Sequence, residues 1–238
     1  MAQTENSLIR QLPKTVRRAF LERCEPCELA LSAELGKRGK ALPHAYFPVE
    51  GFISLVIDED SYPALGVGMI GREAMLGSEL ILGTAKPPWR ALVQGPGHGW
   101  RIDTRSLRLA YAENLALRQV LQAFILVRLY QQALGSACER FHLVRPRLAR
   151  WMLMSQDRAH ADSFHVTQEF MALMLGVRRV GVTIAANGFQ HDGLIEYHRG
   201  RITVLDRGAL EAESCSCYAA DKQIHTSLMA AALSQGSA

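Results

Sequence analysis

The residues best suited to chemistry in this sequence are two adjacent arginines, Arg178 and Arg179, in a stretch otherwise rich in apolar residues. A guanidinium group can donate two parallel hydrogen bonds to a guanine edge, and it can also pair with a phosphate. Neighbouring polar side chains could add hydrogen bonds to bases or phosphates. The candidate nucleic-acid contacts in this stretch are Thr167, Gln168, Arg178, Arg179, Val180 and Thr183.

Two short helices must hold these arginines in place. The first is predicted to begin after Thr167, a capping residue, and to end at Gly176, which suits a left-handed turn. A second helix is predicted from near Arg178. Its apolar set is Val180, Val182, Ile184 and Ala185. Two helices joined by a short turn containing glycine are typical of a helix-turn-helix, whose second helix lies in the DNA major groove. A helical hairpin of any globular domain can show the same pattern.

A predicted β-hairpin follows the second helix. Residues 194–198 and 202–205 are strand-like, and Arg199, Gly200 and Arg201 form the turn between them. A hairpin with a basic tip directly after such a helix is a wing, and Arg199 and Arg201 would lie beside DNA phosphates. The alternative for each arginine is a solvated surface charge.

The run HVTQEFMALMLGVRRVGVTIAANGFQHDGLIEYHRGRITVLDRGALEAESCSCY resembles the C-terminal winged helix of the Crp/Fnr family of bacterial transcription regulators. Two earlier segments, YFPVEGFISLV and VGMIGREAMLGSELILG, resemble strand-turn-strand units of the family's sensor domain, so the resemblance covers nearly the whole chain. It implies an α+β fold: an N-terminal β-roll (a cyclic-nucleotide-binding-like double-stranded β-helix), a long dimerisation helix and a C-terminal winged helix-turn-helix. The expected domains are residues 1–107, 108–141 and 142–218, with a tail at 219–238.

The resemblance also implies partners. The protein would bind double-stranded DNA as a homodimer on a palindromic site, with RNA polymerase as a further partner. Arg179 falls where family members carry an arginine that reads guanine. The next family position often holds an acidic residue, but it is Val180 here, which leaves the preferred DNA sequence open. The alternative function is a small-molecule-binding regulatory subunit whose winged helix contacts protein instead of DNA.

The family's nucleotide pocket provides a further comparison. Members that bind cyclic AMP hold its ribose and phosphate with a Gly-Glu pair and a later Arg-Ser pair. The corresponding residues here are Gly71, Arg72 and Glu73, followed by Trp89 and Arg90. The pattern is broken, and Arg72 and Trp89 add bulk where the nucleotide would lie. These residues are the candidate effector pocket, but we expect no cyclic AMP binding; Arg90 could still meet another anion.

Residues Asp103 to about Arg140 are predicted to form one long helix, capped by Asp103 or Thr104. Its wide apolar surface indicates packing on two sides, against its own β-roll and against a second copy. A core helix of a monomer is the alternative. A further helix is predicted over residues 142–159, which makes the joint near residues 141–144 the candidate hinge. A last helix is predicted over residues 222–233.

The five cysteines form no recognisable framework. Cys24 and Cys27 make a single C-x-x-C, whereas a structural zinc needs four ligands and an iron–sulfur cluster usually needs four thiolates. Cys138 falls on the long helix, and Cys215 and Cys217 lie near the C-terminus. We therefore expect unpaired thiols, no metal, no iron–sulfur cluster and no other cofactor.

Composition and the absence of certain motifs narrow the classes of function that remain. Residues 140–218 hold ten arginines against eight acidic residues, and the whole chain carries only +4, so affinity for nucleic acid must depend on where the arginines lie. No apolar run is long enough to span a membrane, and the polar start is unlike a secretory signal, so we expect a cytoplasmic protein. No motif of a zinc protease, serine hydrolase or phosphate-loop enzyme occurs, so we expect no enzymatic activity.

Overall fold

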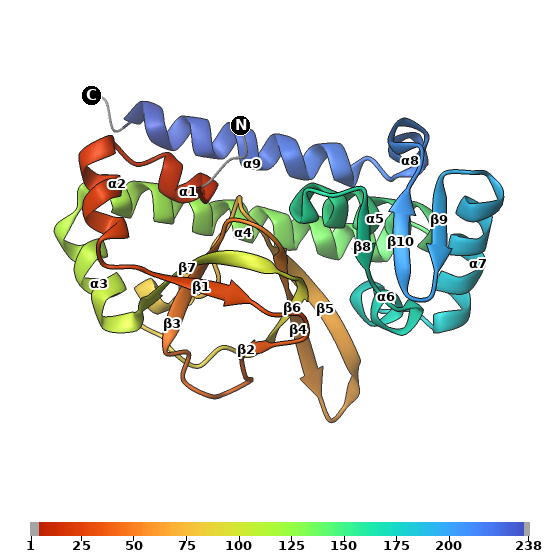
Figure 1. The fold of residues 1–238 in the computed structure, drawn as a ribbon, viewed down its shortest axis with the longest axis horizontal. Coiled ribbons are helices and arrows are strands. Elements are labelled where there is room, and N and C mark those ends of the chain that lie inside the picture. The colour runs from red at the N-terminus through yellow and green to blue at the C-terminus, as the bar shows by residue number, and fades with distance from the viewer. Residues whose placement is uncertain (1–4, 236–238) are drawn as a thin grey trace.

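The computed structural model describes residues 5–235 and divides the chain into two parts joined by a long helix (Figure 1). The N-terminal part begins with two helices, α1 (Ser7–Arg10) and α2 (Lys14–Leu21), and also contains a 3-10 helix, η1 (Ser78–Leu82). Its strands are β1 (Glu25–Leu29), β2 (Glu34–Gly36), β3 (His44–Pro48), β4 (Phe52–Glu59), β5 (Tyr62–Ile70), β6 (Arg90–Gly95) and β7 (Gly97–Asp103).

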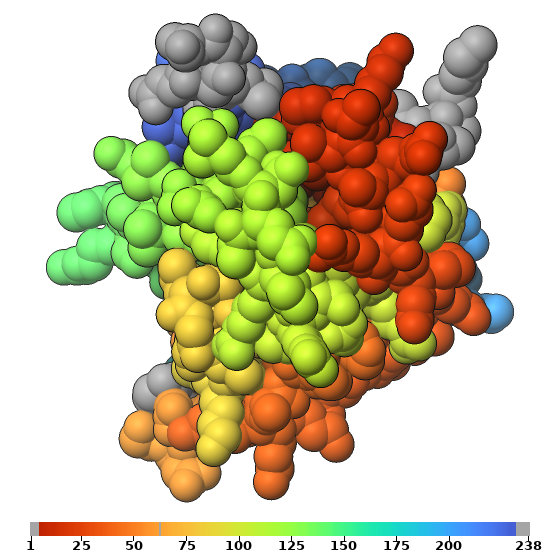
Figure 2. All heavy atoms as spheres, turned by 90° about the vertical axis from the view of Figure 1, so that its left-hand side faces the viewer, coloured from red at the N-terminus to blue at the C-terminus, as the bar shows by residue number. Residues whose placement is uncertain are grey.

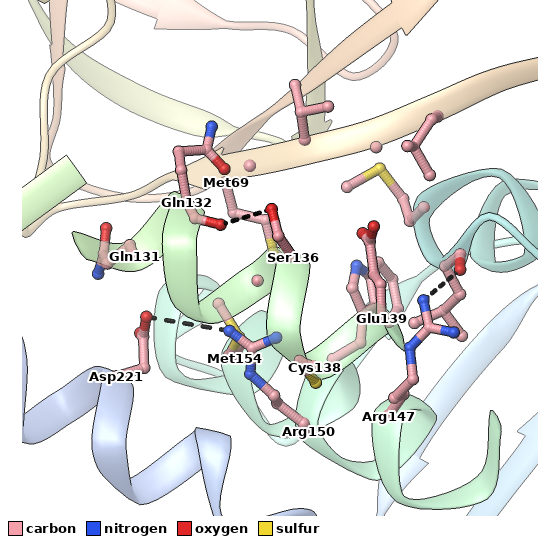
Figure 3. Close-up of a pocket in the computed structure, with 18 of the residues that line it drawn as sticks. Met69, Gln131, Gln132, Ser136, Cys138, Glu139, Arg147, Arg150, Met154 and Asp221 are labelled. Atoms are coloured by element: carbon pink, nitrogen blue, oxygen red, sulfur yellow. Dashed lines mark hydrogen bonds and ion pairs between the residues drawn. The ribbon is translucent and has the colours of Figure 1, made fainter. Parts of the chain in front are cut away.

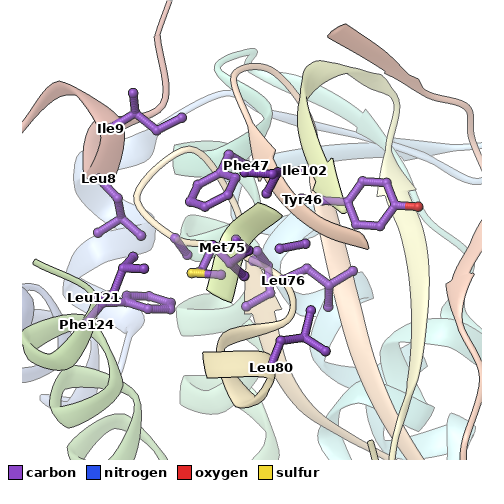
Figure 4. Close-up of a cluster of buried hydrophobic side chains, with 14 of the residues drawn as sticks. Leu8, Ile9, Tyr46, Phe47, Met75, Leu76, Leu80, Ile102, Leu121 and Phe124 are labelled. Atoms are coloured by element: carbon purple, nitrogen blue, oxygen red, sulfur yellow. The ribbon is translucent and has the colours of Figure 1, made fainter. Parts of the chain in front are cut away.

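The strands form two antiparallel sheets, as the short predicted strands and the resemblance to a β-roll imply. One has the order β1-β7-β3 and the other the order β2-β6-β4-β5. Apolar side chains from both sheets meet in one core, which α1 and the long helix also cover (Figure 4). Its largest buried members include Leu8, Ile9, Phe47, Ile53, Ile70, Met75, Leu76 and Phe124.

The stretch predicted as one long helix is two helices, α3 (Thr104–Glu113) and α4 (Leu115–Phe141). Asn114 separates them because its backbone is extended, with φ −125° and ψ 113°, and its side chain accepts a hydrogen bond from the backbone N–H of Leu117 at 2.9 Å. An asparagine oxygen competes with the helix for backbone donors, so it ends one helix and caps the next. The predicted cap of the first helix is confirmed, since Asp103 accepts from Ser106 N at 3.0 Å.

Helices α2 and α3 lie side by side at one end of the molecule, where Figure 2 shows them covering the β-roll. A 2.8 Å ion pair joins Arg23, which follows α2, to Glu113, the last residue of α3. These helices therefore close the end of the N-terminal core that lies farthest from the C-terminal domain.

The C-terminal part is a small domain of helices and a three-stranded sheet. Its elements are α5 (Val144–Ala159), β8 (Ser163–His165), α6 (Gln168–Leu175), α7 (Arg179–His191), β9 (Ile195–His198), β10 (Arg201–Val204) and α8 (Arg207–Glu213). The sheet order is β8-β10-β9, so the predicted hairpin is present and β8, which was not predicted, pairs with its second strand.

The segment expected to be a tail forms the helix α9 (Cys217–Gln235), which returns along α4 (Figure 1). Met229 is 3% exposed and joins the core of the N-terminal part, so α9 belongs to that core. The predicted last helix is confirmed but begins five residues earlier than residue 222, at Cys217. Residues 236–238 lie outside the described residues. None of the described helices is long and apolar enough to cross a membrane.

The two parts pack directly against each other. Phe52, Val56 and Met69 of β4 and β5 are buried in the same apolar cluster as the side chains of α5 and α6. Gly66 permits this approach, because a Cβ atom there would lie only 2.7 Å from the Cα of Met174. Helix α6 therefore packs directly against the backbone of β5 at Gly66.

We expect Gly66→Ala to lower the free energy of unfolding by about 1–3 kcal/mol, because the added methyl group overpacks the contact with α6. Gly135→Ala in α4 is the matched control, since a Cβ there meets nothing within 4 Å. An alanine inside a helix should raise stability by about 0.5–1 kcal/mol. Urea denaturation would measure both, and equal effects from the two variants would contradict the packing argument.

Candidate functional site

Local sequence signals position α6 and α7 as predicted. The Thr167 hydroxyl accepts a hydrogen bond from the backbone N–H of Phe170 at 3.1 Å, and so caps α6. Gly176 ends α6 in the left-handed region, with φ 62° and ψ 37°. Arg178 is the extended residue immediately before α7. These features confirm the helix-turn-helix geometry and place Arg178 and Arg179 at the N-terminal end of its second helix.

The predicted apolar set of α7 divides between two faces of the helix. Val180, which was also a candidate DNA contact, and Ile184 point outward and are 62% and 69% exposed. Asn187 is exposed on the same face, at helical spacing from Ile184. The inner face consists of Val182, Ala185, Ala186 and Phe189. Residue type suggested burial for Val180 and Ile184, whereas the angular position around the helix turns them outward.

The two arginines of α7 are available to a ligand. Arg178 and Arg179 are exposed, and neither guanidinium group has a hydrogen bond or ion pair with any residue between 5 and 235. Other arginines of this domain are engaged internally. Arg145 pairs with Asp192 and Glu213, each at 2.8 Å, and lies over the ring of Phe189.

These internal pairs shift the pKa values of the charged groups that form them. Hydrogen bonds from Arg145 and His191 hold the pKa of Asp192 below its usual value. Hydrogen bonds to Glu213 and Asp192 raise the pKa of Arg145. Since these contacts tie α5 to the end of α7 and to α8, their function is to support α7 rather than to face a ligand.

Two predicted contact residues hold the helix pair together. The Thr183 hydroxyl lies 2.7 Å from Oε1 of Gln168 and 3.1 Å from the carbonyl oxygen of Arg179. This contact joins the second helix to the first residue of α6. Thr183 and Gln168 are half-buried, and Thr167 caps α6 with its hydroxyl. Their structural roles leave the exposed arginines as the main candidates for contact with a ligand.

The wing has the predicted basic tip. Arg199 and Gly200 form the turn with φ values of 47° and 78°, and Arg199 is exposed without a hydrogen bond or ion pair to another described residue. Arg201 is also exposed, and its Nε donates to the hydroxyl of Ser163 in β8. The added strand β8 therefore supports the wing from one side.

The structure divides the five residues of the candidate effector pocket into two groups with different neighbours. Glu73 forms a 2.8 Å ion pair with Arg158 of α5, and Arg72 lies beside it in a cleft bordered by α5 and α9. A Cβ on Gly71 would lie 2.6 Å from Cγ of Arg158.

The second half of the candidate pocket has different neighbours. Arg90 pairs with Glu34 at 2.7 Å and with Asp58 at 3.4 Å. Trp89 packs against the N-terminal core. The absence of cyclic AMP binding remains a prediction.

A different cavity, of about 250 Å³, lies between β5, α4, α5 and α6 (Figure 3). Four arginines and two carboxylates line it, together with apolar side chains such as Met69 and Met154. The charged residues are Arg128, Arg147, Arg150, Arg158, Glu139 and Asp221. Burial and repulsion from Arg158 lower the pKa of Arg128. A surplus of guanidinium groups in a partly enclosed space suits a small anion.

Four possible metal ligands meet beside this cavity, although the sequence predicted no metal. The ligand atoms of Cys138, His142, Cys215 and Cys217 all lie within 4.8 Å of one another. Hydrogen bonding by Cys215 is the main cause that lowers the pKa of Cys138, and His142 and the charge of Arg150 act in the same direction.

Two short spacings in the sequence could have indicated these possible metal ligands. Cys138 and His142 are four residues apart at the end of a helix, and Cys215 and Cys217 form a C-x-C. The predicted C-x-x-C pair has no comparable surroundings. Burial raises the pKa of Cys24 to about 12, and burial also raises the pKa of Cys27.

Residues 146–213 match the model of the Crp-like helix-turn-helix domain, and no curated protein matches the sequence. Among solved structures, a regulator of the Crp/Fnr family from Eubacterium rectale has a TM-score of 0.67 at 15% identity, covering 87% of this chain and 96% of that one. FixK2 from Bradyrhizobium japonicum has a TM-score of 0.68 at 14% identity, covering 81% and 98%. The c-di-GMP-responsive regulator CLP from Xanthomonas campestris has a TM-score of 0.65 at 15% identity, covering 81% and 99%.

These matches confirm the predicted resemblance for the DNA-binding domain and the predicted fold class for the whole chain. The chain therefore carries a Crp-like helix-turn-helix domain and has the fold of the Crp/Fnr transcription regulators.

Proposed function

We propose that this protein is a sequence-specific DNA-binding transcription regulator that acts as a homodimer on a palindromic site. One observation carries the proposal: in a Crp-like helix-turn-helix domain, Arg178 and Arg179 are exposed at the N-terminal end of α7, and their guanidinium groups pair with none of the described residues. The first residues of a recognition helix are those that meet base edges in the major groove.

The exposed face of α7 provides two kinds of base contact. Arg179 can donate two hydrogen bonds to O6 and N7 of a guanine, a contact worth about 1–3 kcal/mol of discrimination. Val180 and Ile184 expose methyl groups, which suit the methyl group of thymine. Arg199 on the wing and the N-terminal amides of α6 suit phosphates. Arginine would thus select guanine, and the apolar pair would favour thymine nearby.

Helix α4 offers a surface for the second copy. Its exposed apolar residues follow the helical repeat in a stripe that neither the β-roll nor α9 covers. The stripe consists of Leu126, Leu129, Tyr130, Ala133 and Ala137. Two such stripes can pack around a two-fold axis as a short coiled coil. A two-fold dimer would present its two α7 helices to half-sites about one DNA turn, roughly 34 Å, apart.

The proposal does not require cyclic AMP. Arg90 already pairs with Glu34 and Asp58, and Glu73 pairs with Arg158, so these charged groups are engaged with the protein itself. In its simplest form, the proposed DNA binding needs no effector and depends only on the concentration of the protein.

Selection from a random DNA pool with the purified, ligand-free protein should enrich a palindrome with guanine at one position of each half-site. Arg179→Ala should relax the preference at that position and weaken binding to the selected site by about 10–100-fold, because one bidentate pair is lost. Arg199→Asn is the control, since asparagine tolerates the left-handed turn and only a phosphate contact disappears. Arg199→Asn should weaken binding to all DNA sequences by the same factor. An unchanged selected sequence for Arg179→Ala would refute the role of α7.

Leu129→Glu should shift the protein from dimer to monomer in light scattering coupled to size-exclusion chromatography, because a charge would enter the apolar stripe. Leu129 is 63% exposed within one chain, so the monomer itself should remain folded. Leu82→Glu is the matched control: Leu82 is 65% exposed, in η1. A dimer that survives Leu129→Glu would exclude this face of α4 as the interface.

A second candidate function is a regulatory subunit whose winged helix contacts protein. The exposed Val180 and Ile184 favour it, because apolar groups on a helix surface also suit a protein groove. Failure to enrich any DNA sequence, with the dimer intact, would favour this alternative over DNA recognition.

A further inference from the structure

Three cysteines and a histidine from distant parts of the chain meet at the joint between the two domains. Cys138 lies in the last turn of α4, and His142 follows the end of that helix. Cys215 lies between α8 and α9, and Cys217 is the first residue of α9. We propose that these four residues bind one zinc ion in tetrahedral coordination and that the ion joins the end of α4 to the start of α9.

The distances fit that coordination. With Zn–S bonds of about 2.3 Å and a Zn–N bond of about 2.0–2.1 Å, a tetrahedron separates two sulfurs by about 3.8 Å, and a sulfur from a nitrogen by about 3.6 Å. The Sγ atoms of Cys138 and Cys215 are 3.5 Å apart, and Sγ of Cys217 lies 3.6 Å from Nδ1 of His142. All four ligand atoms lie within 4.8 Å of one another, at most about 1 Å more than a tetrahedral edge, so small side-chain movements would bring all four around one ion.

The chemistry of the donor set also favours zinc. Three thiolates and one imidazole form a closed set of the kind that structural zinc sites use, with no position left for a substrate. Thiolates select zinc over magnesium or calcium, which prefer oxygen ligands. The three cysteines are only 2–6% exposed, so an ion held by them would be shielded from solvent.

The surroundings support a buried charge. Three thiolates around a divalent cation leave a net charge of −1, and the positive charge of Arg150 acts on both Cys138 and Cys217. The Arg150 side chain is 16% exposed, and its Nε is buried without a hydrogen-bond partner among the described residues. A donor of this kind suits the outer shell of a thiolate site.

The backbone holds both ligand pairs at fixed spacing. The N–H of His142 donates to the carbonyl oxygen of Cys138 at 3.1 Å, which keeps their side chains one helical turn apart. The N–H of Cys215 lies 3.4 Å from the carbonyl oxygen of Pro146 in α5, and Tyr218 N donates to Cys215 O at 3.0 Å. The ion would therefore tie α4, the candidate hinge and the start of α9 into one unit, and would fix the DNA-binding domain relative to the dimer helix.

The first test is the metal content of the purified full-length protein. Mass spectrometry of the metals should find one zinc per chain, and removing it with a strong chelator should lower Tm by more than about 5 °C, because binding to the native state stabilises it. Cobalt(II) added to the metal-free protein should give the thiolate-to-metal absorption and the intense visible bands of a tetrahedral site.

Variants separate zinc binding from other effects of the cysteines. Cys217→Ser should reduce zinc to well below one per chain, whereas Cys24→Ser and Cys27→Ser, which alter cysteines outside the cluster, should leave it at one. Because Cys217→Ser could disturb folding, His142→Cys is the decisive variant. It should retain one metal ion while shifting the cobalt spectrum toward that of four thiolates, a result that a misfolded protein cannot give.

Three results would overturn the proposal: full zinc content in Cys217→Ser, a cobalt spectrum without thiolate absorption, or a Cys138–Cys215 disulfide in metal-free protein purified under reducing conditions. A disulfide would require the sulfurs to approach to about 2.05 Å, and it would make the cluster a redox pair instead. None of these readouts involves DNA, so they stand independently of the proposed transcriptional function.

Discussion

Helix α4 must bury apolar side chains around most of its circumference, and the rest of the structure follows from that requirement. Burying one leucine stabilises a fold by about 1.5–3 kcal/mol, so no face of such a helix can be left uncovered without a substantial cost. The β-roll covers Leu117, Leu121 and Phe124. Helix α9 covers another side, and the stripe around Leu129 remains for a second copy. One helix therefore organises the N-terminal core, the C-terminal helix and the proposed dimer.

The sequence predicts the existence of this arrangement better than its details. Periodicity identifies the inner row of α4, because Leu117, Leu121 and Phe124 recur at helical spacing. It does not identify Asn114 as a break, since an asparagine inside an apolar pattern can also point to solvent. The exposed stripe is hidden in the sequence because its residues alternate with those of the core. Only the positions of the β-roll and α9 decide which leucines remain exposed.

The helix-turn-helix domain also combines features that the local sequence predicts with features that depend on distant residues. Thr167 and Gly176 act through their immediate neighbours, so their capping roles follow from sequence alone. Which arginines are available depends on partners far along the chain: Arg145 pairs with Asp192 and Glu213, whereas the guanidinium group of Arg179 pairs with none of the described residues. The metal-ligand cluster is the extreme case. Cys138 and Cys215 are 77 positions apart, and no local pattern in the sequence indicates that the two pairs of ligands lie together.

The joint between the domains brings together several contacts that link the β-roll to the helix-turn-helix. Helix α6 rests on Gly66 of β5, and the Glu73–Arg158 pair crosses the same boundary. The arginine-lined cavity takes its walls from both sides of this boundary, and Cys138 lines it as well. A ligand can shift a conformational equilibrium only if it binds one arrangement better than the other.

A cavity shared by two domains meets this condition because its shape and charge change whenever α6 leaves β5. A site built entirely inside the β-roll would need a further mechanical link to reach α7. A ligand in the cavity at the joint would therefore act on α6 and α7 more directly than a ligand bound within the β-roll.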